Sequence, residues 1–180
     1  DVADVAIRGL ERADAPLAWW RFEETTGTVA HDEIGGHDAT YAGAPVLGVP
    51  GIAGGRGVSL GGASRPHATT TNTDVRFPGQ LPFTIEVWVT ARSLKDYGRI
   101  AGTEIPNGAG WYLGADPDGT KLWFELNANG TYTRQLMWPG TLSPMRFQHI
   151  VIVYDGATAS MWLDGARVAS TPSKDSAPDV

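Results

Sequence analysis

The stretch HIVIVYDGATASMWLDG, residues 149–165, decides the fold class of this chain. Two runs of alternating apolar and polar residues flank the sequence DGAT at 155–158, and Asp-Gly between such runs is a strong hairpin signal because glycine tolerates a positive φ. We therefore expect two antiparallel strands. Successive side chains on a strand point to opposite faces, so Trp162 and Asp164 share a face that is less apolar than the face carrying Met161.

The composition is that of a turn-rich globular chain, with 180 residues, 23 glycines, 12 prolines and 42% hydrophobic residues. A chain of this length buries roughly 70% of its extended surface and can hold a core without disulfides. There is no cysteine. The net charge of −6 and the scattered basic residues argue against nucleic-acid and anionic-membrane partners. No apolar run reaches the roughly 20 residues of a membrane-spanning helix, so we expect no membrane insertion.

Residues 1–15 differ in pattern from the rest of the chain. Apolar residues between Val2 and Leu10 have helical spacing and Pro16 ends the pattern, which predicts a lead-in helix or a linker. From 16 to 180, short alternating runs predict a single all-β domain, an antiparallel two-sheet sandwich or jelly roll. Strands are expected at 17–24, 57–60, 83–92, 99–104, 110–116, 121–127, 131–138 and in both halves of 149–165, with hairpin turns at DPDG (116–119) and NANG (127–130).

Two further predicted strands repeat the combination of a tryptophan with a carboxylate. In 83–92 the alternation places Glu86 and Trp88 on the less apolar face, and in 121–127 Trp123 and Glu125 share a face in the same way. Indole faces stack on the C–H patches of sugar rings, and carboxylates accept hydrogen bonds from hydroxyls. The candidate ligand contacts are therefore Trp88, Trp123, Trp162, Glu86, Glu125 and Asp164. Alternatively, these tryptophans belong to the core, because tryptophan is highly buried on average.

The loop HDEIGGHDATY, residues 31–41, is a candidate cation site. Asp32 and Asp38 flank two glycines, and hard oxygen ligands on a flexible backbone suit Ca²⁺. We expect Asp32, Gly36 and Asp38 to be the ligands, with Ca²⁺ as the only candidate cofactor. The alternative is that the two carboxylates cap and shape the turn.

Three segments together resemble a known family. They are AWWRFEETTGTVAHDEIGGHDATY (18–41), FTIEVWVTAR (83–92) and FQHIVIVYDGATASMWLDGARV (147–168). In this order they resemble the laminin-G-like jelly rolls of the concanavalin A-like lectin/glucanase superfamily, as found in bacterial surface proteins and in minor tail or fibre proteins of bacteriophages. The resemblance covers about residues 16–168 and implies a concanavalin A-like jelly roll.

The resemblance also carries expectations that this sequence meets only in part. The family continues beyond the WLDG hairpin to a closing strand, which is absent here, so we expect a chain cut short or a strand supplied by something else. Relatives often hold calcium near the loop at 31–41. The superfamily's glucanases carry a Glu-x-Asp-x-x-Glu motif, which this chain lacks, and Asp116 and Asp118 lie in a predicted turn. We therefore expect no catalysis.

These observations lead to three hypotheses for function. The first is a non-catalytic binding or adhesion module that recognises a glycan or a cell-surface polysaccharide, within a larger extracellular, cell-surface or virion-associated protein. The second is a structural jelly roll that decorates an assembly or joins other chains of it. The third is an accessory domain of a carbohydrate-active enzyme. Function inferred from fold alone is analogy, so the binding site itself has to carry the argument.

Overall fold

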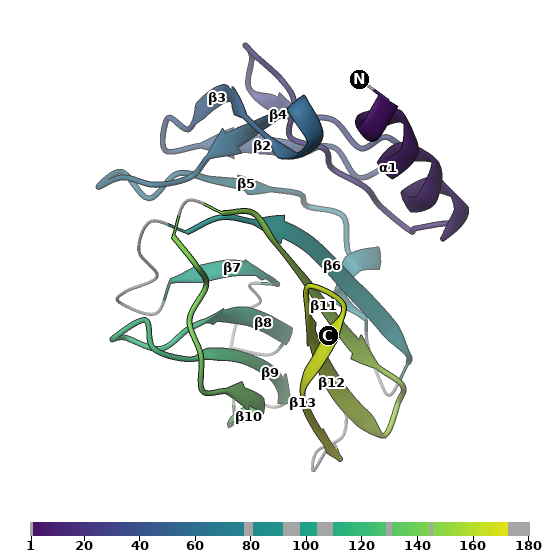
Figure 1. Cartoon of the computed structure of the whole chain (residues 1–180), viewed down its shortest axis with the longest axis vertical. Helices are drawn as coiled ribbons and strands as arrows, with labels where there is room; N and C mark the ends of the chain where they lie inside the picture. Colours follow the sequence, from purple (N-terminus) through teal and green to yellow (C-terminus); the bar gives the residue numbers. More distant parts are fainter. Residues whose placement is uncertain are drawn as a thin grey trace. The chain divides into compact units, whose positions relative to one another are not determined.

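The computed structural model describes residues 2–77, 81–91, 98–103, 110–128, 131–144 and 146–172. The chain divides into two compact units, residues 1–75 and residues 76–180 (Figure 1). Apart from one α-helix and two short 3-10 helices, the described elements are β-strands in antiparallel sheets. The expected all-β class is confirmed, while the expected domain division into 1–15 and 16–180 stays a prediction.

The first unit contains the helix and two small sheets. Its strands pair in the orders β1-β2-β5 and β3-β4. Its core is small and is built on Ala30, Ala39 and Tyr41. Helix α1 has 12 residues, and no helix in the described part of the chain is long and apolar enough to cross a bilayer. The elements are α1 (Val2–Ala13), β1 (Val29–Ala30), β2 (Ala39–Ala42), β3 (Val46–Pro50), η1 (Ile52–Gly54), β4 (Arg56–Ser59) and β5 (His67–Thr69). The short helix η2 (Asp74–Arg76) spans the boundary between the two units in the sequence.

The strand expected at 17–24 does not form. This segment makes an isolated antiparallel bridge between Trp20 and Asp32, and its backbone turns at Phe22, whose φ is +55°. A positive φ breaks the extended conformation, so the alternation of side chains cannot continue through this residue. Trp20 and Phe22 nevertheless pack on the core of the first unit, which accounts for the apolar character of the segment.

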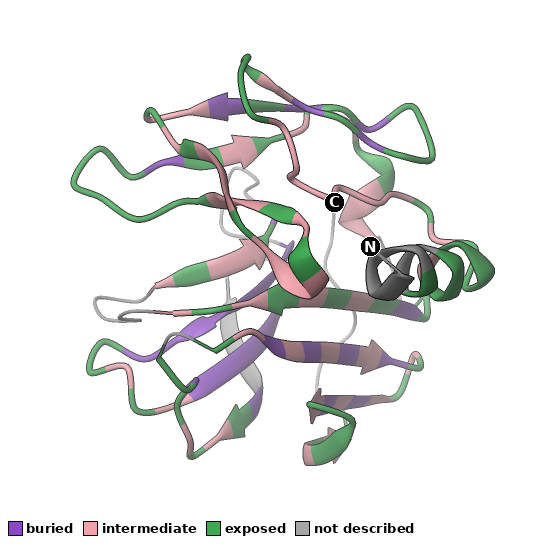
Figure 2. Cartoon of the chain, turned by 45° about the horizontal axis from the view of Figure 1, so that its top comes forward, coloured by how far each residue is buried: buried purple, intermediate pink, exposed green. Residues whose placement is uncertain are grey.

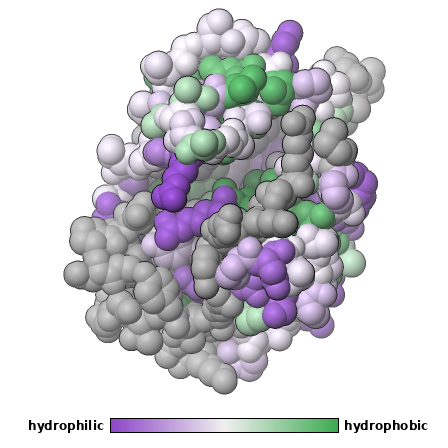
Figure 3. Space-filling model, turned by 90° about the vertical axis from the view of Figure 1, so that its left-hand side faces the viewer, coloured by the Kyte–Doolittle hydropathy of each residue, from purple (hydrophilic) through white to green (hydrophobic). Residues whose placement is uncertain are grey.

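Several apolar side chains are exposed on the first unit, among them Leu10, Val46 and Leu60. On the side of the molecule drawn in Figure 3, apolar side chains, in green, are scattered among polar ones, with one group near the top of the view. Scattered exposed apolar residues are normal for protein surfaces, so these side chains do not define a site by themselves.

The second unit contains two four-stranded antiparallel sheets. One has the strand order β10-β9-β8-β7 and the other the order β13-β12-β11-β6. Residues 149–165 contribute most of β11 and all of β12, which pair as the sequence predicts. The bounds are β6 (Phe83–Val89), β7 (Arg99–Gly102), β8 (Gly110–Ala115), β9 (Leu122–Ala128), β10 (Thr131–Trp138), β11 (Gln148–Tyr154), β12 (Thr158–Leu163) and β13 (Ala166–Pro172).

Both sheets of the second unit contribute to one hydrophobic core. Ile150, Ile152 and Tyr154 alternate along β11 and are at most 1% exposed, and they join Leu122 and Phe124 of the other sheet in a single cluster. In Figure 2 the buried positions, in purple, lie mainly on strands, whereas the loops are mostly exposed. Because β11 faces the core with every second residue, its remaining side chains point to the opposite face of the sheet.

The turns between these strands agree with the sequence. Asp155 Oδ1 accepts hydrogen bonds from the N–H groups of Ala157 and Thr158, which fixes the β11–β12 turn. In DPDG, Gly119 has a φ of +70° and its N–H donates to the Asp116 carbonyl. The NANG turn falls partly outside the described residues.

Four strands of the first unit, β1, β2, β3 and β5, were not among the strands expected from the sequence, and neither was β13. The signal for β13 was present, because Asp164-Gly165 stands between two runs that alternate. Both residues have positive φ, +49° and +80°, and Leu163 pairs with Ala166 across them. This is the two-residue hairpin loop that Asp-Gly favours.

Replacing a core residue of β11 tests whether this strand packs its alternate side chains into the core of the second unit. Ile152→Ala removes a side chain that is 0% exposed and should lower the free energy of unfolding by about 2–5 kcal/mol. Val153→Ala is the matched control, since Val153 lies on the opposite face of the same strand and is half-buried. The measurement is chemical denaturation followed by circular dichroism. Equal losses for the two variants would contradict the alternation described here.

Candidate functional site

The outer face of β6, β11 and β12 brings together several of the candidate contacts. Core-facing residues alternate along each strand, so Glu86, Trp88, His149, Val151 and Trp162 lie on the face that points away from the core. The strand register sets them in rows: His149 pairs with Trp88, and Val151 pairs with both Glu86 and Trp162. We call this surface the outer face.

Trp88 forms an exposed aromatic platform on the outer face. Its indole is 40% exposed and stacks on the His149 imidazole, with ring centroids 4.4 Å apart and planes 14° apart. Glu86 also approaches the His149 ring, with its Oε1 2.5 Å from Nε2. Cross-strand aromatic pairs stabilise a sheet and restrict the side-chain rotamers that form them. The Trp88 indole is thus held in place, while 40% of the residue stays exposed to solvent.

A shallow hollow of about 330 Å³ lies beside this platform. Val151, Val153 and Trp162 give it an apolar floor, and the polar groups in its lining come from His149 and Ser160. This volume is at the lower end of the range for small-ligand sites, about 300–1,000 Å³. An apolar floor with a few polar groups at its margin suits a ligand that has one C–H face and several hydroxyls.

Strand β13 adds polar groups to the same surface. Arg167 pairs with Trp162 across the strands, and its guanidinium carbon lies 5.9 Å from the indole centroid, in the range of a cation–π contact. Ser160 and Ser170 approach each other with their hydroxyl oxygens 3.0 Å apart. Sequence reasoning missed His149, Val151 and Arg167 as site residues. Alternation assigns His149 and Val151 to the face of β11 opposite its core residues, whereas the strand that carries Arg167 was not expected from the sequence. Only the pairing register places these residues next to Trp88 and Trp162.

Asp164, expected as a ligand contact, also forms hydrogen bonds within the protein, and its ligand role stays a prediction. It lies in the β12–β13 loop, and its carboxylate accepts hydrogen bonds from the His149 N–H at 2.9 Å and from Arg146 at 2.7 Å. The hydrogen bond from His149 is the largest cause that holds the pKa of Asp164 below its ordinary value of 3.8, with Arg146 and Gln148 assisting. The carboxylate thus fixes the start of β11. The positive φ of the loop explains why Asp164 does not continue the outward row of Trp162.

Trp123 and Glu125, also expected as ligand contacts, lie on the other sheet. They point away from the core cluster as their alternation predicts, yet they are only 5% and 6% exposed. This burial differs from the expectation of an accessible surface, because residues on both faces of β9 are buried between Leu122 and Leu126. The structure therefore brings together Trp88, Glu86 and Trp162, but not the full set of six. A ligand role for Trp123 and Glu125 stays a prediction.

Asp32, expected as a cation ligand, organises the loop at 31–41. Its Oδ1 accepts hydrogen bonds from the N–H groups of Trp19 and Ile34, and its Oδ2 accepts one from the N–H of His37 and lies 3.1 Å from His37 Nδ1. Burial alone would raise the pKa of Asp32, but these hydrogen bonds outweigh it and the pKa lies below 3.8. His37 continues the chain of contacts, with its Nε2 3.5 Å from Asp74 Oδ2.

The other two expected cation ligands do not converge on Asp32. Asp38 Oδ1 accepts a hydrogen bond from the Asp32 N–H, and the Gly36 carbonyl accepts one from the Asn72 amide. Among the described residues, no group of three or more acidic, His or Cys side chains is arranged to hold a metal. Since both Asp32 oxygens already accept hydrogen bonds, this arrangement fits the turn-shaping alternative better than a Ca²⁺ site. The calcium site stays a prediction.

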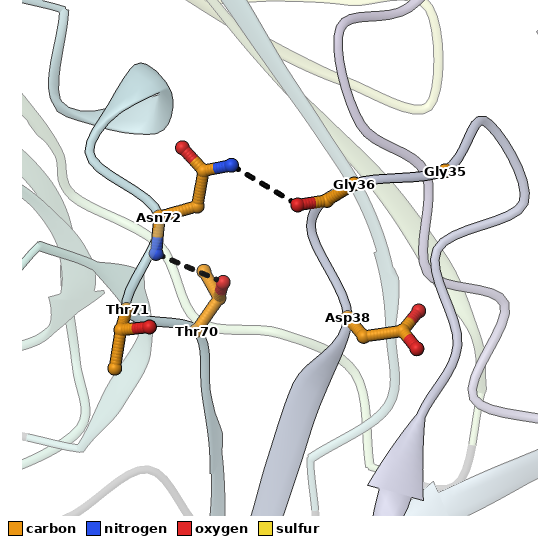
Figure 4. A pocket seen from close by; sticks show the side chains of 6 residues that line it. All are labelled: Gly35, Gly36, Asp38, Thr70, Thr71 and Asn72. Atoms are coloured by element: carbon orange, nitrogen blue, oxygen red, sulfur yellow. Dashed lines mark hydrogen bonds between the residues drawn. The ribbon is translucent and has the colours of Figure 1, made fainter.

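A second hollow, of about 480 Å³, lies within the first unit. It is lined by Gly35, Gly36, Asp38 and the segment Thr70–Asn72. Figure 4 shows the Asn72 amide turned toward the Gly36 carbonyl, whereas the Asp38 carboxylate extends away from the Thr70–Asn72 segment. The polar groups therefore pair with each other or diverge, and they do not converge on a common point.

The chain belongs to the concanavalin A-like lectin/glucanases superfamily, because the model of that family matches residues 61–180. Among solved structures, the chain is similar to domain 4 of AbnA, an extracellular GH43 arabinanase from Geobacillus stearothermophilus, solved in complex with arabinotriose. The TM-score is 0.61 and the sequence identity is 15%, and the match covers 82% of this chain and 72% of that chain. The carbohydrate-binding module CBM66 from Bacillus subtilis gives a TM-score of 0.40 at 16% identity, over 57% of this chain and 66% of that one. No curated protein matches the chain significantly.

Two tryptophan substitutions test which of these indoles is buried and which is exposed. Trp123→Ala should lower the free energy of unfolding by about 3–5 kcal/mol, because it empties the space of a large buried side chain. Trp88→Ala removes a platform that is 40% exposed and should cost clearly less. Urea denaturation of both variants measures the difference. A smaller loss for Trp123→Ala than for Trp88→Ala would contradict the burial described here.

Asp32→Asn tests the role of the loop carboxylate through pH. A carboxylate whose pKa is lowered on folding stabilises the protein above its unfolded pKa of about 3.8, and this stabilisation is lost as the pH falls through the folded value. At pH 7 we expect Asp32→Asn to cost about 1–3 kcal/mol. The cost should shrink on acidification below pH 3.8, as followed by thermal and denaturant unfolding.

The control is Asp14→Asn, which changes an exposed carboxylate of the same unit. It should leave stability nearly unchanged at both pH values. A cost for Asp32→Asn that is the same at pH 7 and in acid would show that the ionised carboxylate is not what holds the loop.

Proposed function

We propose that this chain is a non-catalytic glycan-binding module and that the outer face of β6, β11 and β12 is its binding surface. The observation that carries the proposal is the half-exposed Trp88 indole, stacked on His149 and set beside an apolar hollow that Trp162 borders. Pyranose and furanose rings present C–H patches that stack on indoles, and their hydroxyls match the polar groups at the margin of the hollow. The arabinotriose bound to the solved domain of similar fold supports this class of ligand.

Binding at such a surface would be modest for each sugar. The hollow is open and shallow, so little area is buried, and each ligand hydroxyl exchanges a hydrogen bond with water for one with the protein. Useful avidity would come from several copies or from neighbouring domains, which raise the effective concentration. We therefore extend the proposal to a module of a larger extracellular or virion-associated protein that adheres to a surface polysaccharide.

A glycan array tests the proposal, read with wild-type chain and with Trp88→Ala and Trp162→Ala. We expect wild-type binding to one glycan class and at least a tenfold loss for each variant, since each removes a stacking surface. Met137→Ala is the matched control, because Met137 is 44% exposed and lies on the other sheet. Circular dichroism confirms folding of every variant, and a repeat with calcium and with chelator tests the cation prediction.

A blank array from folded wild-type protein would overturn the glycan proposal. A stable multimer by analytical ultracentrifugation in that case would favour the structural jelly roll, since an open sheet face or edge can join chains. Binding that survives both tryptophan variants would instead move the site away from the outer face.

A further inference from the structure

The charges on the outer face carry a further inference, which rests on the proposed glycan-binding function. We infer that this face selects acidic glycans, and that Arg167 binds a carboxylate carried by the sugar that stacks on Trp162. The register defines a row of four residues across four strands, Glu86, Val151, Trp162 and Arg167. One end of this row is a carboxylate and the other is a guanidinium.

The two ends of the row differ in how their charges are satisfied. Glu86 lies 2.5 Å from the His149 imidazole, so its carboxylate already has a partner. Nearby, Arg146 is paired with Asp164 at 2.7 Å. Arg167 is exposed, and among the described residues no carboxylate lies within ion-pair distance of its guanidinium. It is therefore the charged group of this face that remains open to a ligand.

The position of Arg167 suits a substituent of a stacked sugar. Its guanidinium carbon lies over the Trp162 ring, 5.9 Å from the ring centroid, so a sugar that packs on the remaining indole surface has its substituents next to the guanidinium. A guanidinium offers two parallel N–H donors that match the two oxygens of a carboxylate, and such charge-assisted hydrogen bonds are roughly twice as strong as neutral ones. A neutral sugar at the same place would leave this capacity unused.

Repulsion from Glu86 does not oppose this arrangement. Adjacent strands are about 4.8 Å apart, so three strand spacings separate the two ends of the row by roughly 14 Å. The Debye length is about 10 Å at 0.1 M salt, and exposed charges beyond it are largely screened. The attraction at Arg167 acts at contact distance and outweighs the distant carboxylate. The net charge of −6 therefore does not argue against an acidic ligand at this position.

The experiment compares uronic-acid oligosaccharides with their own methyl esters, in which a methyl group replaces the negative charge of the carboxyl group. The probes are oligomers of galacturonate, glucuronate and mannuronate, each in acid and ester form, and binding is measured by isothermal titration calorimetry at 0.05 M and 0.3 M salt. For at least one sugar we expect wild-type chain to bind the acid about tenfold more tightly than the ester at low salt. The ratio should fall at high salt.

Four variants test whether Arg167 causes this preference. Arg167→Gln should reduce the acid-to-ester ratio to about one while leaving ester binding within about twofold, and Arg167→Lys should restore part of the ratio. Arg56→Gln, which removes an exposed arginine of the first unit, should leave the ratio unchanged. Trp162→Ala should weaken the acid and the ester alike.

The outcomes separate the inference from the function on which it rests. Equal wild-type binding of acid and ester, or a ratio that survives Arg167→Gln, overturns the acidic preference while the glycan-binding function stands. Glycan binding confined to neutral sugars on the array would likewise overturn the acidic preference and leave the glycan-binding function standing. Failure of folded wild-type chain to bind any acid, any ester or any arrayed glycan overturns the proposed function and the inference together.

Discussion

The contact between the two sheets of the second unit is the constraint on which the rest of this unit depends. Ile150, Ile152 and Tyr154 of β11 are almost completely buried against residues of β9, and β11 is the strand that β6 and β12 both flank. Burying these three side chains fixes which face of β11 points inward, because a shift of one residue would expose all three. His149, Val151 and Val153 are then directed to the outer face, and the register carries Trp88 and Trp162 with them.

Most of this arrangement could be read from local patterns. Alternation with a period of two gave β6, β11, β12 and the assignment of Glu86, Trp88 and Trp162 to an outer face, since one side of that sheet is core and the other is not. The same reasoning failed at residues 17–24, where apolar and polar residues alternate but Phe22 takes a positive φ. Its side chain packs on a small core without a strand. Alternation of apolar and polar residues indicates that one side of a segment is buried. A turn whose apolar side chains pack on a core can produce the same alternation without forming a strand.

The candidate site was harder to predict because it depends on contacts between strands that are distant in sequence. Trp123 and Trp88 have the same local context, a tryptophan two residues from a glutamate on a less apolar face, yet one is 5% and the other 40% exposed. What covers the second face of a strand is not encoded in the strand itself. Likewise, the stack of Trp88 on His149 joins residues about 60 positions apart, and only the β6–β11 register reveals it.

The WLDG sequence that helped to identify the family contributes to the site indirectly. Asp164 does not reach the outer face, but its carboxylate accepts the hydrogen bond of the His149 N–H, and its own N–H donates to the His149 carbonyl. Both backbone groups of His149 are therefore held by one loop residue. Because the His149 ring lies against Trp88 and Glu86, the β12–β13 loop sets the position of the platform. Asp164 of this motif thus fixes the backbone from which the outer-face side chain of His149 projects.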